Sequence, residues 1–349
     1  MSIPDDEHSL GAYDFHLPPS LIADRPADVR HRSRLMIVDR SADDIAHRHF
    51  EDLVDELTSR DLLVFNDSRV LAARLHLAKK DTGGKVEALL VEASDESGLL
   101  WRAMARPQRS LSSGMSLVVP SDPSVVVTIE SVEKDGFVIL RLPVPGQQLS
   151  ERFGSVPLPP YIDREPDELD ADRYQTVYAR RDRAGSVAAP TAGLHFSQDL
   201  LQRIDARGVP RAHVTLDVGP GTFLPIKVSD MREHTMHAER FDLPAATISA
   251  IRETKASGGR VIAVGTTTTR VLESFEDLTP GPGTTSLFIR VGHRFRWVDS
   301  LITNFHLPKS TLLVLVSALA GQERILRAYR EAVHRGYRFY SYGDAMWIR

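Results

Sequence analysis

The sequence predicts an α/β protein interrupted by an all-β domain, that is, a mixed-sheet α/β domain plus a small six-stranded antiparallel β-barrel. Three observations support this prediction. Strand and helix patterns alternate near both ends of the chain, only short strand patterns occur from residue 74 to about 143, and a charged, proline-marked connection then leads back to the α/β pattern. We therefore expect a discontinuous α/β domain of residues 1–73 and 153–349 and an inserted barrel of residues 74–152.

The first part of the chain predicts a strand, a helix and a second strand. Apolar runs at residues 34–39 (RLMIVD) and 61–67 (DLLVFND) have the length and composition of buried strands. Between them, FEDLVDELTS at 50–59 has helical spacing of its apolar residues. This order is typical of an α/β layer.

The middle part predicts six strands separated by Gly, Ser, Pro and Asp. Closing six short strands into a barrel removes the exposed edges that an open sheet would leave. The expected strands are 74–80, 85–93, 99–106, 115–120, 124–133 and 137–143.

The last part returns to alternating helices and strands. Several of its helical patterns end in glycine, a frequent C-terminal stop. We expect strands at 212–219, 260–265, 286–291 and 300–305, and helices at 197–208, 247–259, 268–277 and 322–336.

Composition limits the chemistry and the cellular location. The 349 residues suggest two domains, and 42% hydrophobic with 26% charged residues is ordinary for a globular protein. No apolar run is long enough to cross a bilayer, and the acidic start MSIPDDEHSL does not resemble a signal peptide, so we expect a cytoplasmic protein. The absence of cysteine rules out disulfides, thiolate metal sites and a cysteine nucleophile.

The net charge of −4 argues against binding nucleic acid through bulk electrostatics, but it leaves room for a local basic face. Basic stretches occur at 179–183, 290–297 and 323–342. Each alone is best explained as a solvated helix face or strand edge, and only together do they favour a nucleic-acid partner.

Three segments are rich in glycine and other small residues, so that their backbone can come close to a ligand. GSVAAPTAGLHF at 185–196 is either a turn that caps the next helix or a loop shaped for a ligand. VTLDVGPGTFLPI at 214–226 is either a corner between strands or a ligand loop at a strand end. VIAVGTTTTRVLES at 261–274 lacks the lysine and second glycine of a P-loop, which leaves a threonine N-cap or a site for a polar ligand group.

Two further segments carry polar side chains. REHTMHAERF at 232–241 lacks the pattern of a zinc protease and an evident third ligand, so polar contacts or a surface position explain it better than a metal. Asn304 and His306, like Tyr342 and Asp344, adjoin apolar runs. Since burying such groups unpaired costs roughly 1–3 kcal/mol each, they either pair with one another or face a pocket.

Taken together, the segments resemble a known family. FNDSRVLAARL, GGKVEALLVE, PLPPYI, YQTVYA, GSVAAPTAGLHF, VGPGTF, HTMHAE, VGTTTTRVLES, LITNFHLPKSTLL and YSYGDAM are similar, in order, to the signature blocks of the S-adenosylmethionine:tRNA ribosyltransferase-isomerases of queuosine biosynthesis. The resemblance covers nearly the whole chain. It implies an α/β domain with an inserted barrel and a monomeric enzyme that uses S-adenosylmethionine as cosubstrate, without another cofactor or a metal.

The resemblance also implies the reaction and its partner. Such enzymes transfer and isomerise the ribosyl group of S-adenosylmethionine onto the aminomethyl-deazaguanine (preQ1) at the wobble position of a tRNA anticodon stem-loop, giving epoxyqueuosine and releasing adenine and methionine. Two alternatives remain: a paralogue with a different acceptor, and a non-catalytic RNA-binding protein. Among the basic stretches, we expect the C-terminal one, with Arg327 and Arg330, to contribute to tRNA binding.

The proton transfers of this reaction require groups that titrate near neutrality. The candidates are His195, Asp217, His234, Glu239 and His306. Asp217 stands where the family is expected to have a histidine, and a carboxylate is the weaker base unless burial raises its pKa. His195 is therefore the favoured proton carrier at neutral pH.

The resemblance also implies a set of substrate contacts, to S-adenosylmethionine or to the modified base. Phe196, Tyr342 and Asp344 are candidates to lie near the sulfonium, because aromatic faces and carboxylates attract a cation. The threonine-rich turn at 265–269 is the candidate for the methionine carboxylate or the ribose hydroxyls. The full set is Asp67, Arg69, Tyr174, Gln175, Pro190, Thr191, Gly193, Phe196, Gly221, Thr222, Gly265, Thr266, Thr267, Arg270, Asn304, Tyr342 and Asp344.

Overall fold

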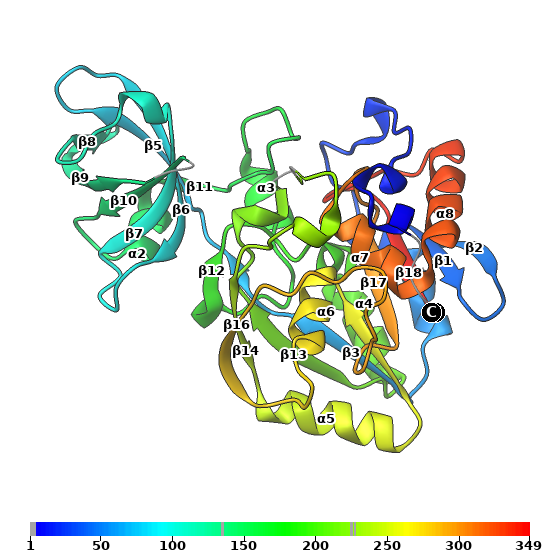
Figure 1. Cartoon of the computed structure of the whole chain (residues 1–349). Helices are drawn as coiled ribbons and strands as arrows, with labels where there is room; N and C mark the ends of the chain where they lie inside the picture. Colours follow the sequence, from blue (N-terminus) through cyan, green and yellow to red (C-terminus); the bar gives the residue numbers. More distant parts are fainter. Residues whose placement is uncertain (1–4, 134–135, 224–225, 227) are drawn as a thin grey trace.

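The computed structural model describes residues 5–133, 136–223, 226 and 228–349. A small barrel, cyan to green in Figure 1, projects from a larger α/β body that contains both the beginning and the end of the chain. The predicted fold class, a mixed-sheet α/β domain with an inserted six-stranded antiparallel barrel, is confirmed. The exact limits of the two domains stay a prediction.

The α/β body is built on a nine-stranded mixed sheet. Its order is β16-β14-β13-β3-β15-β17-β18-β1-β2, and the central strands β13, β3, β15 and β17 are parallel. The strands are β1 (Arg34–Asp39), β2 (Asp44–His49), β3 (Asp61–Asn66), β13 (Arg211–Leu216), β14 (Glu239–Leu243), β15 (Arg260–Val264), β16 (Gly281–Thr285), β17 (Ser300–Asn304) and β18 (Ala345–Ile348).

Helices cover this sheet, and the core lies on both of its faces. Every residue of β3 is buried, with Leu62 and Val64 in one hydrophobic cluster and Leu63 and Phe65 in another, as the two-residue period of a strand requires. The α-helices of the body are α1 (Leu53–Glu56), α3 (Glu168–Arg173), α4 (Gln198–Ala206), α5 (Ala245–Ala256), α6 (Thr266–Glu273), α7 (Thr311–Ala320) and α8 (Gln322–His334).

Short 3₁₀ helices connect many of these elements. They are η1 (Asp5–His8), η2 (Leu10–Tyr13), η3 (Pro19–Leu21), η4 (Arg30–Arg32), η5 (Phe50–Asp52), η6 (Gln108–Ser110), η8 (Arg181–Arg183), η9 (Thr191–His195), η10 (Pro220–Phe223) and η11 (Met231–Glu233). None of the helices in the described ranges is long and apolar enough to pass through a membrane.

The barrel contains the six strands that the sequence predicts. They follow one another as β5-β6-β7-β10-β9-β8, and pairing between β5 and β8 closes the ring around a hydrophobic cluster of its own. The strands are β5 (Arg74–Lys79), β6 (Lys85–Ala93), β7 (Leu100–Arg106), β8 (Ser116–Val119), β9 (Asp122–Val132) and β10 (Phe137–Arg141). Helix α2 (Gly146–Phe153) and strand β11 (Gly154–Ser155), paired with β5, lead out, and β4 (Arg69–Val70) pairs with β12 (Ala184–Ser186) in the body.

The structure differs from the sequence prediction in a few elements. The strand predicted at 286–291 is wrong: its apolar residues pack on the core without joining the sheet, and the neighbouring GPGTT of β16 pairs with β14 instead. The helix predicted at 50–59 is shorter, because η5 and α1 end at Glu56. The prediction also missed β2, a mostly exposed edge strand, and α7, whose N-cap is Ser310.

Candidate active site

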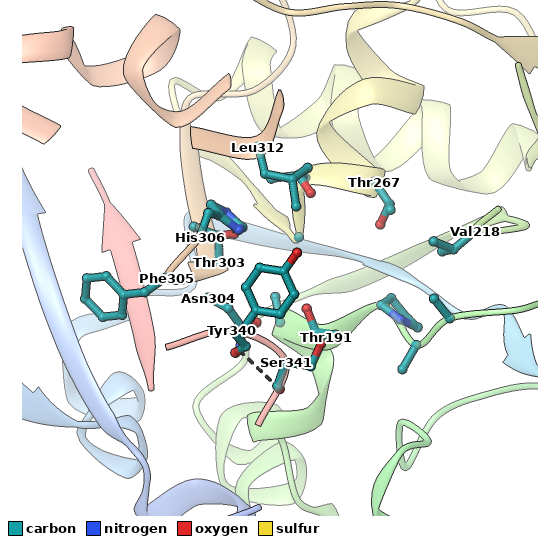
Figure 2. A pocket seen from close by; sticks show the side chains of 16 residues that line it. Thr191, Val218, Thr267, Thr303, Asn304, Phe305, His306, Leu312, Tyr340 and Ser341 are labelled. Carbon is teal, nitrogen blue, oxygen red and sulfur yellow. Dashed lines mark hydrogen bonds between the residues drawn. The ribbon is translucent and has the colours of Figure 1, made fainter. Parts of the chain in front are cut away.

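The carboxyl ends of the four central parallel strands meet at one edge of the sheet, and each leads into one of the predicted segments. Asp67 follows β3, Asp217 follows β13, Gly265 follows β15, and His306 lies just beyond β17. Ligands of open α/β sheets bind at this edge. A cavity of about 530 Å³, counting the part open to solvent, lies there (Figure 2). It is lined by seven of the predicted residues: Pro190, Thr191, Gly265, Thr266, Thr267, Asn304 and His306.

The loop at 185–196 combines both interpretations that the sequence left open. Ser197, just after it, caps α4 by accepting a hydrogen bond from the Leu200 amide at 3.1 Å. Residues 188–192 line the cavity. Gly193 has a packing reason to be glycine, since a Cβ there would lie 1.9 Å from the Tyr178 hydroxyl.

The threonines at the start of α6 divide into two kinds. Gly265 precedes the helix with φ of 95°, a conformation that favours glycine. The Thr268 and Thr269 hydroxyls donate back to the carbonyls of Val264 at 2.9 Å and Gly265 at 3.1 Å. In contrast, the buried Thr267 Oγ1 lines the cavity and has no partner among the described residues. Thr267 therefore offers a hydroxyl to a ligand (Figure 2).

Asn304 also presents an unsatisfied atom. Its Nδ2 donates to the Tyr340 carbonyl at 2.9 Å and the Ser341 carbonyl at 3.4 Å, and contacts His195 Nε2 at 3.2 Å. Because carbonyls only accept, the amide nitrogen must face them, and Oδ1 is left on the other side. This Oδ1 is buried without a partner in the described part of the chain. A bound group that donates a hydrogen bond would satisfy it.

His195 is buried beside Ser33, Phe50 and Asn304. Its Nδ1 lies 2.7 Å from the Ser33 hydroxyl, and its ring stacks on Phe50 with centroids 5.0 Å apart. Burial lowers the pKa of His195 to about 4, so the ring is uncharged at neutral pH. It lines a second cavity and not the first. The proton transfer predicted for His195 stays a prediction, and the contact of its Nε2 with Asn304 Nδ2 suits a role in orienting that amide.

The other two candidate histidines also have lowered pKa values. His306 lines the cavity, its Nε2 lies 3.0 Å from the Thr303 hydroxyl, and burial lowers its pKa to about 3. His234 is half-buried outside the cavity lining, edge-on to Phe288, and burial followed by the charge of His237 lowers its pKa.

Burial brings the pKa of Asp217 towards neutrality. Burial raises the pKa of its carboxyl from 3.8 to about 6, against the opposing charges of Arg240 and Arg183. The carboxylate lies against Gly185, where a Cβ would come within 2.5 Å of Asp217 Oδ1. Asp217 is not part of the cavity lining, although its neighbour Val218 is.

Glu239 and Arg270 bind each other. They form a buried ion pair, and the Glu239 Oε1 also accepts a hydrogen bond from the Gly219 amide at 2.9 Å. Arg270 Nε donates to the Leu287 carbonyl at 3.0 Å. The pair thus ties the loop after β13 to α6, and neither side chain belongs to the cavity lining.

Three residues predicted to lie near a sulfonium lie outside the cavity. Phe196 is fully buried in the hydrophobic cluster beneath the sheet. Asp344 is held by Arg34, whose Nη2 lies 2.9 Å from the carboxylate. The Tyr342 hydroxyl donates to Asp170 at 2.8 Å, and Tyr342 lines the second cavity.

The remaining predicted residues do not belong to the cavity lining. Asp67 accepts a hydrogen bond from the Thr215 hydroxyl at 2.6 Å, and the Gln175 side chain bonds the backbone of Val70 at 3.1 and 3.3 Å. Their companions are Tyr174, buried edge-on to Tyr342; Arg69, half-buried on β4; and Gly221, packed against His237. The Thr222 backbone belongs to η10, and its side chain lies outside the described residues.

Sequence reasoning missed Tyr340. Figure 2 shows its ring between Thr191, Thr267, Leu312 and His306. Its φ is 75°, a conformation that is rare for a bulky residue and that clusters at functional sites. A backbone angle of this kind leaves no sequence signal, and the prediction selected Tyr342, two positions away.

Comparison with known proteins identifies the family. The sequence profile of the queuosine biosynthesis protein family matches residues 10–348. The chain belongs to this queuosine biosynthesis family. A curated member named S-adenosylmethionine:tRNA ribosyltransferase-isomerase, from Anaeromyxobacter dehalogenans (strain 2CP-C), is 51% identical over 97% of this chain and 98% of its own length. A member of the same name from Geotalea uraniireducens (strain Rf4) is 48% identical over 97% and 99%.

A solved structure of the queuosine biosynthesis family agrees with the fold. The S-adenosylmethionine tRNA ribosyltransferase from Thermotoga maritima is 36% identical, with a TM-score of 0.55 over 97% of this chain and 100% of that chain. The predicted family resemblance is therefore confirmed. In the described residues of this chain, no three His, Asp or Glu side chains lie close enough together to hold a metal ion.

Proposed function

We propose that this member of the queuosine biosynthesis family transfers and isomerises the ribosyl group of S-adenosylmethionine onto the aminomethyl group of preQ1 at the wobble position of tRNA. The product is epoxyqueuosine, with adenine and methionine released. Full-length similarity to curated ribosyltransferase-isomerases supports the activity. The observation that supports its location is the cavity at the carboxyl edge of the parallel strands.

The cavity suits a nucleoside that carries a positive charge. Most of its wall is apolar or small, and two of its buried polar atoms, Thr267 Oγ1 and Asn304 Oδ1, have no partner among the described residues. Asn304 Oδ1 only accepts, so it would bind an amino or ring N–H group of a base, and Thr267 would bind a hydroxyl or a ring nitrogen. The face of Tyr340 would attract the sulfonium through its quadrupole.

The chemistry needs proton transfers at three points. The sulfonium acidifies the ribose 5′ C–H, so a base must remove that proton; adenine needs a proton to leave; and the acceptor amine must arrive uncharged. Asp217, with its pKa raised to about 6, is the proposed acid–base residue. His195 positions the Asn304 amide. S-adenosylmethionine serves as cosubstrate, and none of these steps requires a metal. We further propose that the enzyme acts as a monomer in the cytoplasm.

The test follows both leaving groups. The protein is incubated with labelled S-adenosylmethionine and tRNA that carries preQ1, and free adenine and methionine are measured. Both are expected, in equal amounts, with this tRNA and not with tRNA that carries guanine. If adenine and methionine are released only with a different acceptor, the protein is a paralogue with another substrate. If no acceptor leads to their release, the proposed activity is overturned.

A further inference from the structure

A second cavity, of about 270 Å³ counting its open part, lies beside the first and shares Ser341 with it. It is bounded by η4, the C-terminal end of α3, η9 and the loop after Tyr340. Its polar lining consists of Arg30, Ser33, Arg173, His195, Ser341 and Tyr342. Two of these side chains are cationic, and no acidic side chain belongs to the lining within the described residues.

The charge of Arg30 is buried, and its ion-pair partner within the described residues is the exposed Asp172. Its side chain is 10% exposed, and it donates to the carbonyls of Asp172 at 2.8 Å, Arg173 at 3.3 Å and Leu194 at 3.3 Å. These bonds cap the end of α3, but carbonyl groups are neutral and do not neutralise the positive charge. The Asp172 carboxylate lies 3.7 Å away and is 82% exposed, so solvent screens it.

Arg173 adds a second positive charge to the same cavity. Its terminal nitrogens donate to the carbonyls of Ala27 at 2.6 Å and Asp28 at 3.2 Å. Its Nε is buried and has no partner in the described chain. The two guanidinium groups are close enough that, after burial, the charge of Arg173 is the largest cause that lowers the pKa of Arg30. Two neighbouring positive charges, together with the buried and unpartnered Nε of the half-buried Arg173, favour an anion.

The other carboxylates near this cavity are already bound. Asp344 pairs with Arg34 and accepts a hydrogen bond from the Arg338 amide at 2.8 Å. Asp170 accepts two hydrogen bonds from Arg164, at 2.5 and 2.8 Å, and is capped by the Tyr342 hydroxyl. Neither carboxylate is therefore free to neutralise Arg30 and Arg173.

We propose that the second cavity is an oxyanion site in which Arg30 and Arg173 bind one carboxylate or phosphate group of a molecule whose reacting part occupies the first cavity. The wall at Ser341, shared by the two cavities, makes this arrangement possible for one extended ligand. Resting on the proposed function, the two sources of such a group are the methionine carboxylate of S-adenosylmethionine and a phosphate of the bound tRNA.

The anion site itself is tested without turnover, with inorganic phosphate as the probe. Phosphate is expected to raise the melting temperature of the wild-type protein, because a ligand that binds only the folded state stabilises it. The rise should disappear in Arg173→Gln and persist in Arg173→Lys. The matched control is Arg25→Gln, since Arg25 is 47% exposed, pairs with Asp167 and does not line the cavity.

A second variant covers the case in which Arg173→Gln fails to fold. Ala27→Glu keeps both arginines and places a carboxylate at the cavity wall, where it should occupy the site and abolish the response to phosphate. A phosphate response in Ala27→Glu or Arg173→Gln as large as that of the wild type would overturn the proposal.

Two binding measurements then distinguish the sources. If the methionine carboxylate binds here, the Kd for S-adenosylmethionine without tRNA should rise about tenfold or more in Arg173→Gln. If a tRNA phosphate binds here, Arg173→Gln should leave the Kd for S-adenosylmethionine unchanged and weaken tRNA binding. The slope of log tRNA affinity against log salt concentration should then decrease by about one. Wild-type values for both ligands would overturn the proposal. Absence of adenine release from the wild-type enzyme would instead count against the proposed function alone.

Discussion

Burial changes the order in which the candidate proton carriers titrate. An imidazole is charged when protonated and a carboxyl when deprotonated, so desolvation lowers the pKa of the first and raises that of the second. His195, with its pKa lowered to about 4, and Asp217, with its pKa raised to about 6, show the two effects. The sequence favoured His195 because reference pKa values describe solvated groups. With its pKa raised to about 6, Asp217 titrates closer to neutrality than a solvated carboxyl does.

Asp217→Asn tests this order through pH dependence. In the wild-type enzyme, kcat/KM is expected to fall below pH 6 as Asp217 takes up a proton; the variant should lose most activity and that limb of the profile. Stability gives a second readout. Because the pKa of Asp217 is higher in the folded than in the unfolded protein, its ionisation lowers the free energy of unfolding. This destabilisation is absent below pH 3.8, grows between pH 3.8 and about 6, and is complete above pH 6. The Tm of the variant should therefore exceed that of the wild type by more at pH 7 than at pH 4.

His195→Gln is the control for the pH experiment. Glutamine can keep an acceptor near Asn304 Nδ2, so the variant should retain part of the activity with an unchanged pH profile, whereas His195→Leu should lose it through a higher KM. If instead His195→Gln lost the fall of kcat/KM below pH 6 and Asp217→Asn kept it, His195 would be the acid–base residue and Asp217 would not.

At the scale of elements, the start of α6 separates threonines that serve the helix from one that serves the cavity. Thr268 and Thr269 satisfy their hydroxyls within the helix, whereas the Thr267 hydroxyl is buried and unpaired in the described structure. An unpaired buried hydroxyl lowers stability unless a ligand satisfies it. The Thr267 hydroxyl therefore lowers the stability of the free protein, and a ligand in the cavity that bonds this hydroxyl would remove the loss.

Thr267→Val and Thr268→Val form a matched pair. In Thr267→Val, the affinity for S-adenosylmethionine is expected to fall about three- to tenfold, the value of one hydrogen bond, with equal or higher Tm. Thr268→Val should lower the Tm and change the affinity little, because its hydroxyl bonds the Val264 carbonyl. Calorimetric titration and thermal unfolding measure both. An unchanged affinity in Thr267→Val would remove this hydroxyl from the site.

The periodicity of apolar residues predicted most helices and strands. It failed for segments whose structure depends on pairing with another part of the chain. The six barrel strands and β1, β3, β13, β15 and β17 have apolar patterns of their own. Strand β16 is GPGTT, which has none, and forms because β14 offers a pairing partner. The cavity edge could likewise be predicted from segments at strand ends. The contribution of Tyr340, and the arginines of the second cavity, depended on contacts between residues far apart in the sequence.

For the whole molecule, a net charge of −4 means that tRNA must meet a local basic surface. That the C-terminal basic stretch contributes to tRNA binding stays a prediction. The structure shows which of its arginines are paired with a carboxylate and which are not. On α8, Arg324 and Arg327 both contact the Asp43 carboxylate, at 2.8 and 2.6 Å. Arg330 is exposed and donates to the Leu326 carbonyl at 3.1 Å, and no carboxylate partner is found for it within the described ranges.

Charge reversal on α8 therefore separates tRNA binding from surface pairing. If this face meets tRNA, Arg330→Glu should weaken binding and reduce the slope of log affinity against log salt by about one, because a lost phosphate contact no longer releases its counterion. Arg327→Glu places a carboxylate beside Asp43 and should lower the Tm slightly, with a smaller effect on the slope, since Asp43 already offsets that charge. Filter binding from low to high salt measures both. Equal slopes in the wild type and Arg330→Glu would assign tRNA binding to another face, with the exposed arginine of η8, Arg181, as the next position to reverse.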